Sequence, residues 1–176
     1  MNKKYMILIS GKAQAGKNTF ALGLFGFFEY AFANQLKKFA MELGWNKDKD
    51  KRGRKFLQDL ATVVREYNQR TWVNLICKTL EMDKYPDKVV ITDCRYLNEI
   101  RIMKQWGEQN GYNVVTVRIE RPEYNNMLTD EAKTHPSETE LDGYCFNHIV
   151  YNIGTLGDLI SIASNNFSLK VIEGDL

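Results

Sequence analysis

Short apolar runs alternate along the chain with segments whose apolar positions recur at helical spacing. Residues 5–9 and 88–93 have continuous apolar centres, a pattern typical of strands that are buried on both faces of a sheet. Residues 27–32 are aromatic, residues 113–119 alternate between apolar and polar, and residues 147–151 complete the set. These five segments are the predicted strands.

Helical periodicity is clearest in the middle of the chain, from residue 56 and again over residues 72–82. Further helices are predicted over residues 17–25, 35–43, 98–109 and 155–163, the last with Thr155 as N-cap. The polar residues 46–55 read as a mobile connection, and residues 123–140 as a flap. Strands that alternate with helices predict an α/β fold with about five parallel strands and helices on both faces.

Length and composition are those of an ordinary globular chain. The 176 residues suit one domain, residues 1–176. The net charge of +2 gives no indication of nucleic-acid binding, and the apolar run after the N-terminus is too short for a membrane span. The three cysteines, which include no CxxC pair, suit a reducing compartment. We therefore expect a cytoplasmic protein without nucleic-acid or membrane partners.

A glycine-rich segment, residues 11–19, carries the strongest chemical signal. It reads Gly-Lys-Ala-Gln-Ala-Gly-Lys-Asn-Thr and lies between a predicted strand and a predicted helix, as a phosphate-binding loop must. Backbone N–H groups of such a loop surround phosphate oxygens, and Lys17 can reach the β- and γ-phosphates of ATP. The predicted ATP-binding residues of the loop are Gly11, Ala13, Ala15, Gly16, Lys17, Asn18 and Thr19. The alternative is a glycine-rich turn that binds nothing.

Asp93 ends the second buried strand, and Arg95 follows two residues later; together they form a candidate catalytic pair. Strand ends of a parallel sheet meet at one edge, so Asp93 should lie near the phosphate loop. An Asp at this place can complete a Mg²⁺ site, and a guanidinium suits phosphate binding. The usual hydroxyl after the loop lysine is replaced by Asn18, so we expect Asn18 and Asp93 to hold Mg²⁺, with Thr19 on a phosphate or the metal. The alternative is an N-capping Asp and a surface Arg.

The order of these motifs resembles the deoxynucleoside monophosphate kinases of tailed bacteriophages, over about residues 5–160. The segments that carry the likeness are residues 16–19, 32–37, 54–62 with 72–74, 92–99, 120–122, 137–141 and 152–156. Ala61 stands where the family usually has Gly, Val63 where it often has an acid, and the chain is short between Gly44 and Arg54.

This resemblance implies a P-loop kinase, built as a three-layer sandwich, that uses ATP to convert deoxynucleoside monophosphates to diphosphates in the host-cell cytoplasm. An acceptor-binding helical region is expected at about residues 34–84 and a flap at about residues 121–140. The implied substrate-binding residues are Lys37, Arg54, Gln58, Arg65 and Arg95. Arg121 is expected to close over the transferred group and Asn152 to contact the ATP adenine. Residues 137–140 are expected mainly to cap a helix, as a capping box.

Other readings of the same residues stay open. A different P-loop small-molecule kinase, for a nucleoside or a phosphomevalonate-type acceptor, would share the donor site. A non-catalytic nucleotide-binding module would need neither Asp93 nor Arg95, which argues against it. Base specificity, sugar specificity and a homodimer are likewise left open by the sequence.

Overall fold

A five-stranded parallel sheet forms the centre of the computed structural model, which describes residues 3–48, 50–122 and 128–170. The strands are β1 (Lys4–Ser10), β2 (Phe28–Tyr30), β3 (Lys88–Cys94), β4 (Tyr112–Glu120) and β5 (His148–Tyr151). Their order across the sheet is β2-β3-β1-β4-β5, and each neighbouring pair is parallel. The predicted α/β class with five parallel strands is confirmed.

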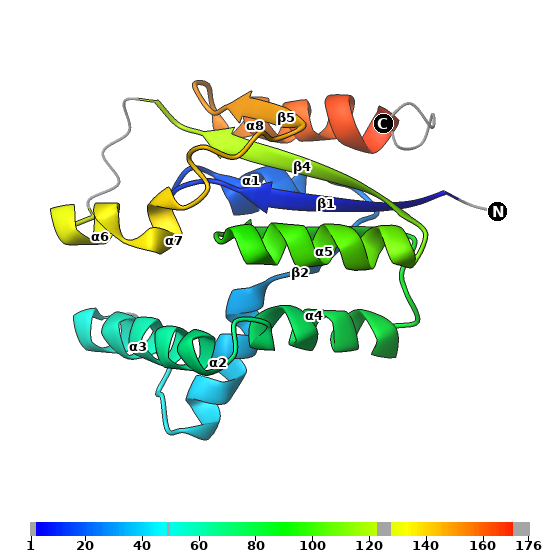
Figure 1. Ribbon diagram of the computed structural model, residues 1–176. Helices are drawn as coiled ribbons and strands as arrows, with labels where there is room; N and C mark the ends of the chain where they lie inside the picture. Colours follow the sequence, from blue (N-terminus) through cyan, green and yellow to red (C-terminus); the bar gives the residue numbers. More distant parts are fainter. Residues whose placement is uncertain (1–2, 49, 123–127, 171–176) are drawn as a thin grey trace.

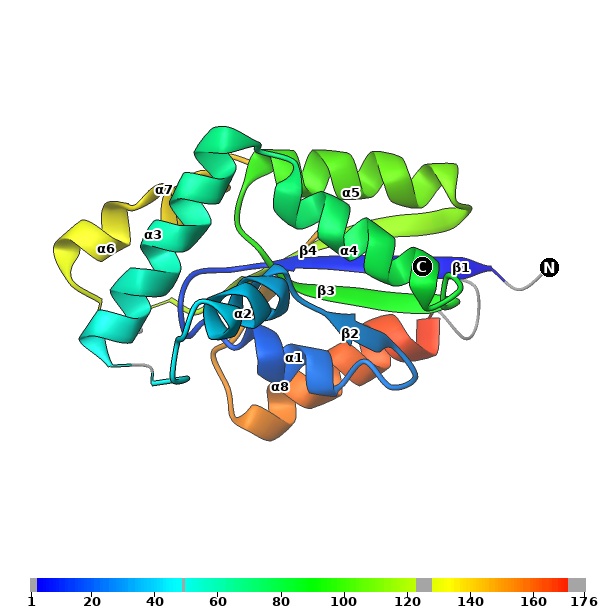
Figure 2. The same ribbon diagram turned by 90° about the horizontal axis from the view of Figure 1, so that it is seen from below.

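Helices cover both faces of this sheet (Figures 1 and 2). The helices are α1 (Lys17–Leu22), α2 (Phe32–Glu42), α3 (Lys51–Tyr67), α4 (Thr71–Met82), α5 (Leu97–Gln109), α6 (Asp130–Thr134), α7 (Pro136–Thr139) and α8 (Leu156–Ala163), which continues into a π-helical turn, Ser164–Ser168. Side chains of α2, α4 and α5 pack on one face, and those of α1 and α8 on the other. The three-layer arrangement is as predicted.

The continuous apolar run of β1 follows from its place at the middle of the sheet. Met6 and Leu8 point into the core under α4 and α5, whereas Ile7 and Ile9 point into the core under α1 and α8. All four side chains are fully buried. Because side chains alternate between faces and both faces are covered, neither set can be polar.

Two of the boundaries that differ from the prediction have a clear local reason. Phe32 begins α2 instead of ending a strand, because the Asp93 carboxylate accepts hydrogen bonds from the first amides of that helix. Residues 46–55 are only partly a connection, since α3 begins at Lys51. Asp50 caps it by accepting from the Gly53 amide at 2.6 Å. This cap compensates for a first turn without apolar residues.

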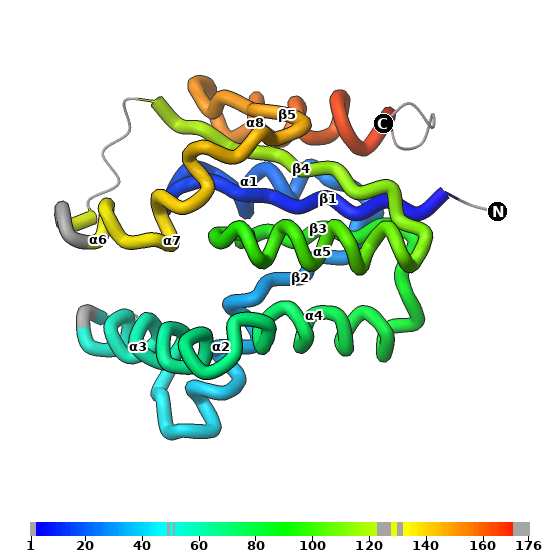
Figure 3. The backbone as a smooth tube through the Cα atoms, in the orientation of Figure 1, coloured from blue at the N-terminus to red at the C-terminus, as the bar shows by residue number. Residues whose placement is uncertain are grey.

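The carboxyl ends of the strands converge at one edge of the molecule. The loops after β1 and β3 open there, and α3, α6 and α7 lie at the same end, away from the N-terminus (Figures 1 and 3). Part of the predicted flap, residues 123–127, lies outside the described residues. In the part of the chain that is described, no helix has both the length and the apolar character needed to cross a lipid bilayer.

Candidate functional site

The predicted phosphate loop connects β1 to α1 and has a backbone that requires glycine. Gly16 has φ of +105°, and a Cβ there would lie 2.6 Å from Asn152 Nδ2 and 2.9 Å from Leu159 Cδ2. Asn152 itself donates a hydrogen bond to the Ala15 carbonyl at 2.9 Å. The segment after β5 therefore supports the loop directly, and a side chain at position 16 would displace it.

Lys17 lies folded over its own loop. Its Nζ donates to the carbonyls of Gly11 at 2.7 Å and Lys12 at 2.8 Å, and its side chain is buried. Burial, with a smaller contribution from the nearby Arg95, lowers the pKa of Lys17 to about 8, although the Glu138 and Asp93 carboxylates oppose the shift. The ammonium is thus charged at neutral pH and held by carbonyls that an anion could replace.

A first pocket, of about 480 Å³, opens beside the loop. It brings together six of the residues predicted for ATP binding or closure. Its lining consists of Gln14, Gly16, Lys17, Asn18, Thr19, Arg121, Asn152, Gly154 and Leu156. Arg121 reaches the loop across the pocket, with Nη1 3.5 Å from the Gln14 carbonyl. We call this space the donor pocket.

A second pocket, of about 360 Å³, lies at the end of β3 between α2, α3 and α4. Gln58, Arg65, Asp93 and Arg95 line it as predicted members, and so does Ala13 of the phosphate loop. Phe32, Leu36, Leu57, Ala61, Trp72 and Tyr96 make most of the remaining wall apolar. A mainly apolar cleft with a few polar groups is typical of a small-molecule site. We call it the acceptor pocket.

Two predicted residues lie apart from this pocket. Among the described residues, the lining of the acceptor pocket includes neither Lys37 of α2 nor Arg54 of α3, and Arg54 is exposed. Lys37 is half-buried on the helix whose first turn forms the pocket wall. The cation that the structure brings to the end of β3 is instead Arg95.

Asp93 connects β3 to the acceptor pocket through the N-terminus of α2. Its two carboxylate oxygens accept from the Phe32 and Ala33 amides, each at 2.8 Å. Burial raises the pKa of Asp93, while these two amides, Arg95 and Lys17 oppose the rise. The expected metal residues are thereby divided, since Asp93 lines the acceptor pocket and Asn18 lines the donor pocket. Asp93 caps α2 and not the helix that follows it in sequence.

Glu99 is a buried acid for which the sequence predicted no role, although it ends the family-like segment 92–99. One of its oxygens accepts from the Arg95 amide at 2.8 Å and the Tyr96 amide at 3.1 Å, and the other from Arg65 Nη2 at 3.2 Å. Burial raises the pKa of Glu99 to about 7, and Arg65 opposes the shift. Arg65 also stacks on the Tyr96 ring, 4.0 Å from its centre. These contacts fix Arg65 in the pocket wall.

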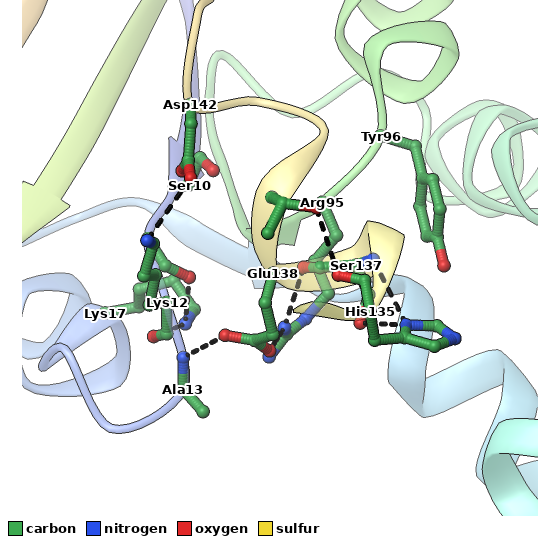
Figure 4. A network of polar contacts seen from close by, with 12 residues as sticks. Ser10, Lys12, Ala13, Lys17, Arg95, Tyr96, His135, Ser137, Glu138 and Asp142 are labelled. Carbon is green, nitrogen blue, oxygen red and sulfur yellow. Dashed lines mark hydrogen bonds and ion pairs between the residues drawn. The ribbon is translucent and has the colours of Figure 1, made fainter. Parts of the chain in front are cut away.

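Glu138 corrects the interpretation of residues 137–140 as a capping box. The cap of α7 is His135, whose Nδ1 accepts from the Ser137 amide, and Pro136 is the first helical residue. Glu138 faces the phosphate loop instead: its Oε2 accepts from the Ala13 amide at 2.7 Å, and its Oε1 pairs with Arg95 Nη1 (Figure 4). The preference of Pro for the first helical position could have placed this helix start correctly.

A second polar contact joins the segment after α7 to the loop. Asp142 pairs with Lys12 at 3.2 Å (Figure 4). It also pairs with Arg118 at 2.8 Å. Arg118 is buried and also donates to Ser10 at 3.1 Å. The chain that carries Glu138 is therefore attached to the phosphate loop at two points.

No protein-family model and no curated protein matches this sequence, but solved structures share its fold. Dephospho-CoA kinase from Campylobacter jejuni is 15% identical with a TM-score of 0.55, over 98% of this chain and 100% of that one. The Mycobacterium tuberculosis APS kinase in complex with AMPPNP and APS is 10% identical, with a TM-score of 0.54 over 98% and 99%. The tunicamycin resistance protein of Deinococcus radiodurans is 14% identical, with a TM-score of 0.54 over 93% and 95%. The chain has the fold of the P-loop kinases.

The raised pKa of Glu99 makes stability depend on pH. Between the ordinary value of 4.5 and about 7, the folded protein holds a proton that the unfolded chain releases, so the free energy of unfolding falls as pH rises through this range. Relative to Glu99→Gln, the wild type should lose about 1–3 kcal/mol between pH 5 and 8, measured by urea denaturation. Exposed Glu108 on the same helix gives the control, Glu108→Gln. An equal pH slope in wild type and Glu99→Gln would contradict this assignment.

Proposed function

We propose that this protein is an ATP-dependent kinase that converts deoxynucleoside monophosphates to diphosphates. The observation that carries the proposal is the meeting of two pockets at one phosphate loop. Lys17 lines the donor pocket and Ala13 lines the acceptor pocket. A phosphoryl group bound at the loop would thus have a donor on one side and an acceptor on the other, as transfer between two bound molecules requires.

The donor pocket supports the assignment of ATP. Backbone amides of the loop and the start of α1 favour a polyphosphate, and Lys17 adds the positive charge. Asn152, Gly154 and Leu156 form the part of this pocket beyond the loop, which agrees with an adenine contact near residue 152. Arg121, at the end of β4, is positioned to close over the phosphates.

The oxygen donors around the loop fit Mg²⁺. Asn18 offers an amide oxygen and Thr19 a hydroxyl in the donor pocket, and these are ligands that a hard cation accepts. The Asp93 oxygens each accept one amide and keep a second lone pair. Among the described residues no group of three His, Cys, Asp or Glu could hold a metal alone, so phosphate oxygens and water would complete the shell. Bound Mg²⁺ would neutralise charge on the transferring phosphates.

The acceptor pocket supports a nucleotide with its phosphate toward the loop. Phe32, Trp72 and Tyr96 provide flat apolar surface for a base, and Gln58 can both donate and accept hydrogen bonds to its edge. Arg95 is the cation nearest the loop in this pocket. We assign the acceptor phosphate to Arg95, and assign Lys37 and Arg54, which lie outside the lining, to a supporting electrostatic role.

The proposed mechanism is positional and electrostatic. A phosphate oxyanion attacks the γ-phosphorus without a general base, since it carries no proton that must be removed. Lys17 and the loop amides hold the donor, Arg95 holds the acceptor in line, and Arg121 covers the transferred group. These cations stabilise negative charge that spreads over the phosphoryl oxygens in the transition state.

The substrate assignment predicts which acceptors release ADP. We expect Mg²⁺-dependent ADP release with one or more deoxynucleoside monophosphates, and little or none with ATP alone. A coupled ADP-release assay over all deoxy- and ribonucleoside monophosphates measures this. Nucleosides and phosphomevalonate serve as comparison acceptors, and turnover with these alone would redirect the proposal to another small-molecule kinase. ATP binding without turnover on any acceptor would indicate a binding module.

Removal of the loop ammonium should abolish transfer without unfolding the protein. Lys17→Ala is expected to lower kcat by about a thousandfold or more, because the cation acts on charge that develops in the transition state. The same assay measures kcat, and thermal unfolding reports the fold. Lys104→Ala, on the exposed side of α5, is the matched control. Wild-type turnover in purified Lys17→Ala would refute the role of Lys17.

The lowered pKa of Lys17 predicts that nucleotide affinity depends on pH. Below its pKa of about 8 the ammonium is charged and attracts phosphate, and above that value it is neutral. The ADP phosphates are already ionised at neutral pH, so the Kd for ADP should rise about tenfold from pH 7 to 9. Isothermal titration calorimetry measures the Kd, and Lys17→Met should remove the dependence. Parallel pH profiles in the two proteins would show that another group is responsible.

A further inference from the structure

The carboxylate of Glu138 lies at the junction of the donor and acceptor pockets. It receives the Ala13 amide on one oxygen and Arg95 on the other, and only 9% of the residue is exposed. Figure 4 shows the side chain reaching from α7 between the loop and Arg95. A negative group thus lies between the phosphate loop and the cation that faces it.

The partners of this carboxylate are those that a phosphate would use. A carboxylate and a phosphate both present oxygens that accept from backbone N–H groups and from guanidinium. Lys17 is close enough that Glu138 acts on its titration. In the proposed function, Arg95 holds the acceptor phosphate, and Ala13 of the loop lines the same pocket. The protein therefore supplies its own anion to that subsite.

The local structure of α7 holds Glu138 in this place. His135 caps the helix, and Arg95 Nη1 also donates to the Ser137 carbonyl at 3.1 Å, next to its pair with Glu138. Asp142, a few residues on, pairs with Lys12 and Arg118. If Glu138 left the loop, the Asp142 contacts would keep this segment beside it.

We propose that Glu138 occupies the acceptor-phosphate subsite and competes with the acceptor phosphate for Arg95 and the Ala13 amide. The inference rests on the proposed function and deepens it. A phosphate dianion can replace the carboxylate, because it returns a negative partner to Arg95. An unphosphorylated acceptor cannot, because Arg95 would lose its partner in a partly buried place, and leaving one charge of such a pair uncompensated is costly. Glu138 thus sets how tightly a phosphate binds in this pocket, whereas an acceptor without a phosphate leaves the carboxylate on Arg95 and the Ala13 amide.

The experiment compares anion affinity in Glu138→Gln and the wild type by isothermal titration calorimetry. The probes are inorganic phosphate, the deoxynucleoside monophosphates and the matching deoxynucleosides. Glutamine keeps the shape of the side chain but removes its charge, so phosphate and the monophosphates should bind about tenfold tighter. Deoxynucleoside affinity should stay within about twofold, since no charge-assisted contact changes. Thermal unfolding establishes that the variant folds, and Glu138→Ala should tighten phosphate binding in the same direction.

Glu140→Gln is the matched control, because it removes one negative charge from the same segment. Its carboxylate accepts from the Leu97 amide and lies outside the lining of both pockets as the structure describes them. Three results would each overturn the proposed competition. The first is that Glu140→Gln binds phosphate as much more tightly than the wild type as Glu138→Gln does. The others are that Glu138→Gln leaves phosphate affinity unchanged, or that it raises the affinity for deoxynucleosides as much as the affinity for monophosphates. Tighter phosphate binding in Glu138→Gln alone, in a protein that phosphorylates no nucleotide, would support the competition and reject the substrate. Failure of the competition and failure of the proposed substrate assignment can therefore be told apart.

Discussion

Compensation of buried charge is the constraint on which this site depends. Lys17, Arg65 and Arg95 line the two pockets, and each has a defined negative or carbonyl partner: the loop carbonyls, Glu99 and Glu138, respectively. Without these partners each partly desolvated cation would be costly to keep in place. In this structure these three cations are therefore already paired within the protein. In the proposed function, a bound phosphate would replace these internal partners, so its affinity would depend on the carbonyls and carboxylates that it displaces.

The topology of the sheet explains why these charges meet. β1 and β3 are neighbouring parallel strands that end at the same edge, so Lys17 and Asp93 come close together although they are 76 positions apart in the sequence. Asp93 then binds the first amides of α2, which sets the wall of the acceptor pocket. The same carboxylate thus joins the sheet to the helices that line the acceptor pocket. A substitution at Asp93 would affect pocket shape as well as chemistry.

The fold alone does not identify the acceptor. Structures with this fold carry the names of kinases for APS and dephospho-CoA and of a tunicamycin resistance protein, at 10–15% identity. In this chain the donor pocket is built from the phosphate loop and the segment after β5, whereas the acceptor pocket is built from α2, α3, α4 and α7. The nature of the acceptor must therefore be argued from particular side chains, such as Gln58, Arg65 and Glu138.

The sequence by itself determined the alternation of strands and helices, the parallel sheet and the position of the loop at residues 11–19. These features follow from local periodicity and from glycine spacing, which are properties of neighbouring residues. Only the tertiary structure separated Asp93 from Asn18 into different pockets, left Lys37 and Arg54 outside the acceptor lining, and brought Glu138 to Ala13 across 125 positions. Contacts of that kind depend on which loops the fold brings to one edge and on which charge needs a partner there. Patterns among adjacent residues do not predict such long-range contacts between charged groups.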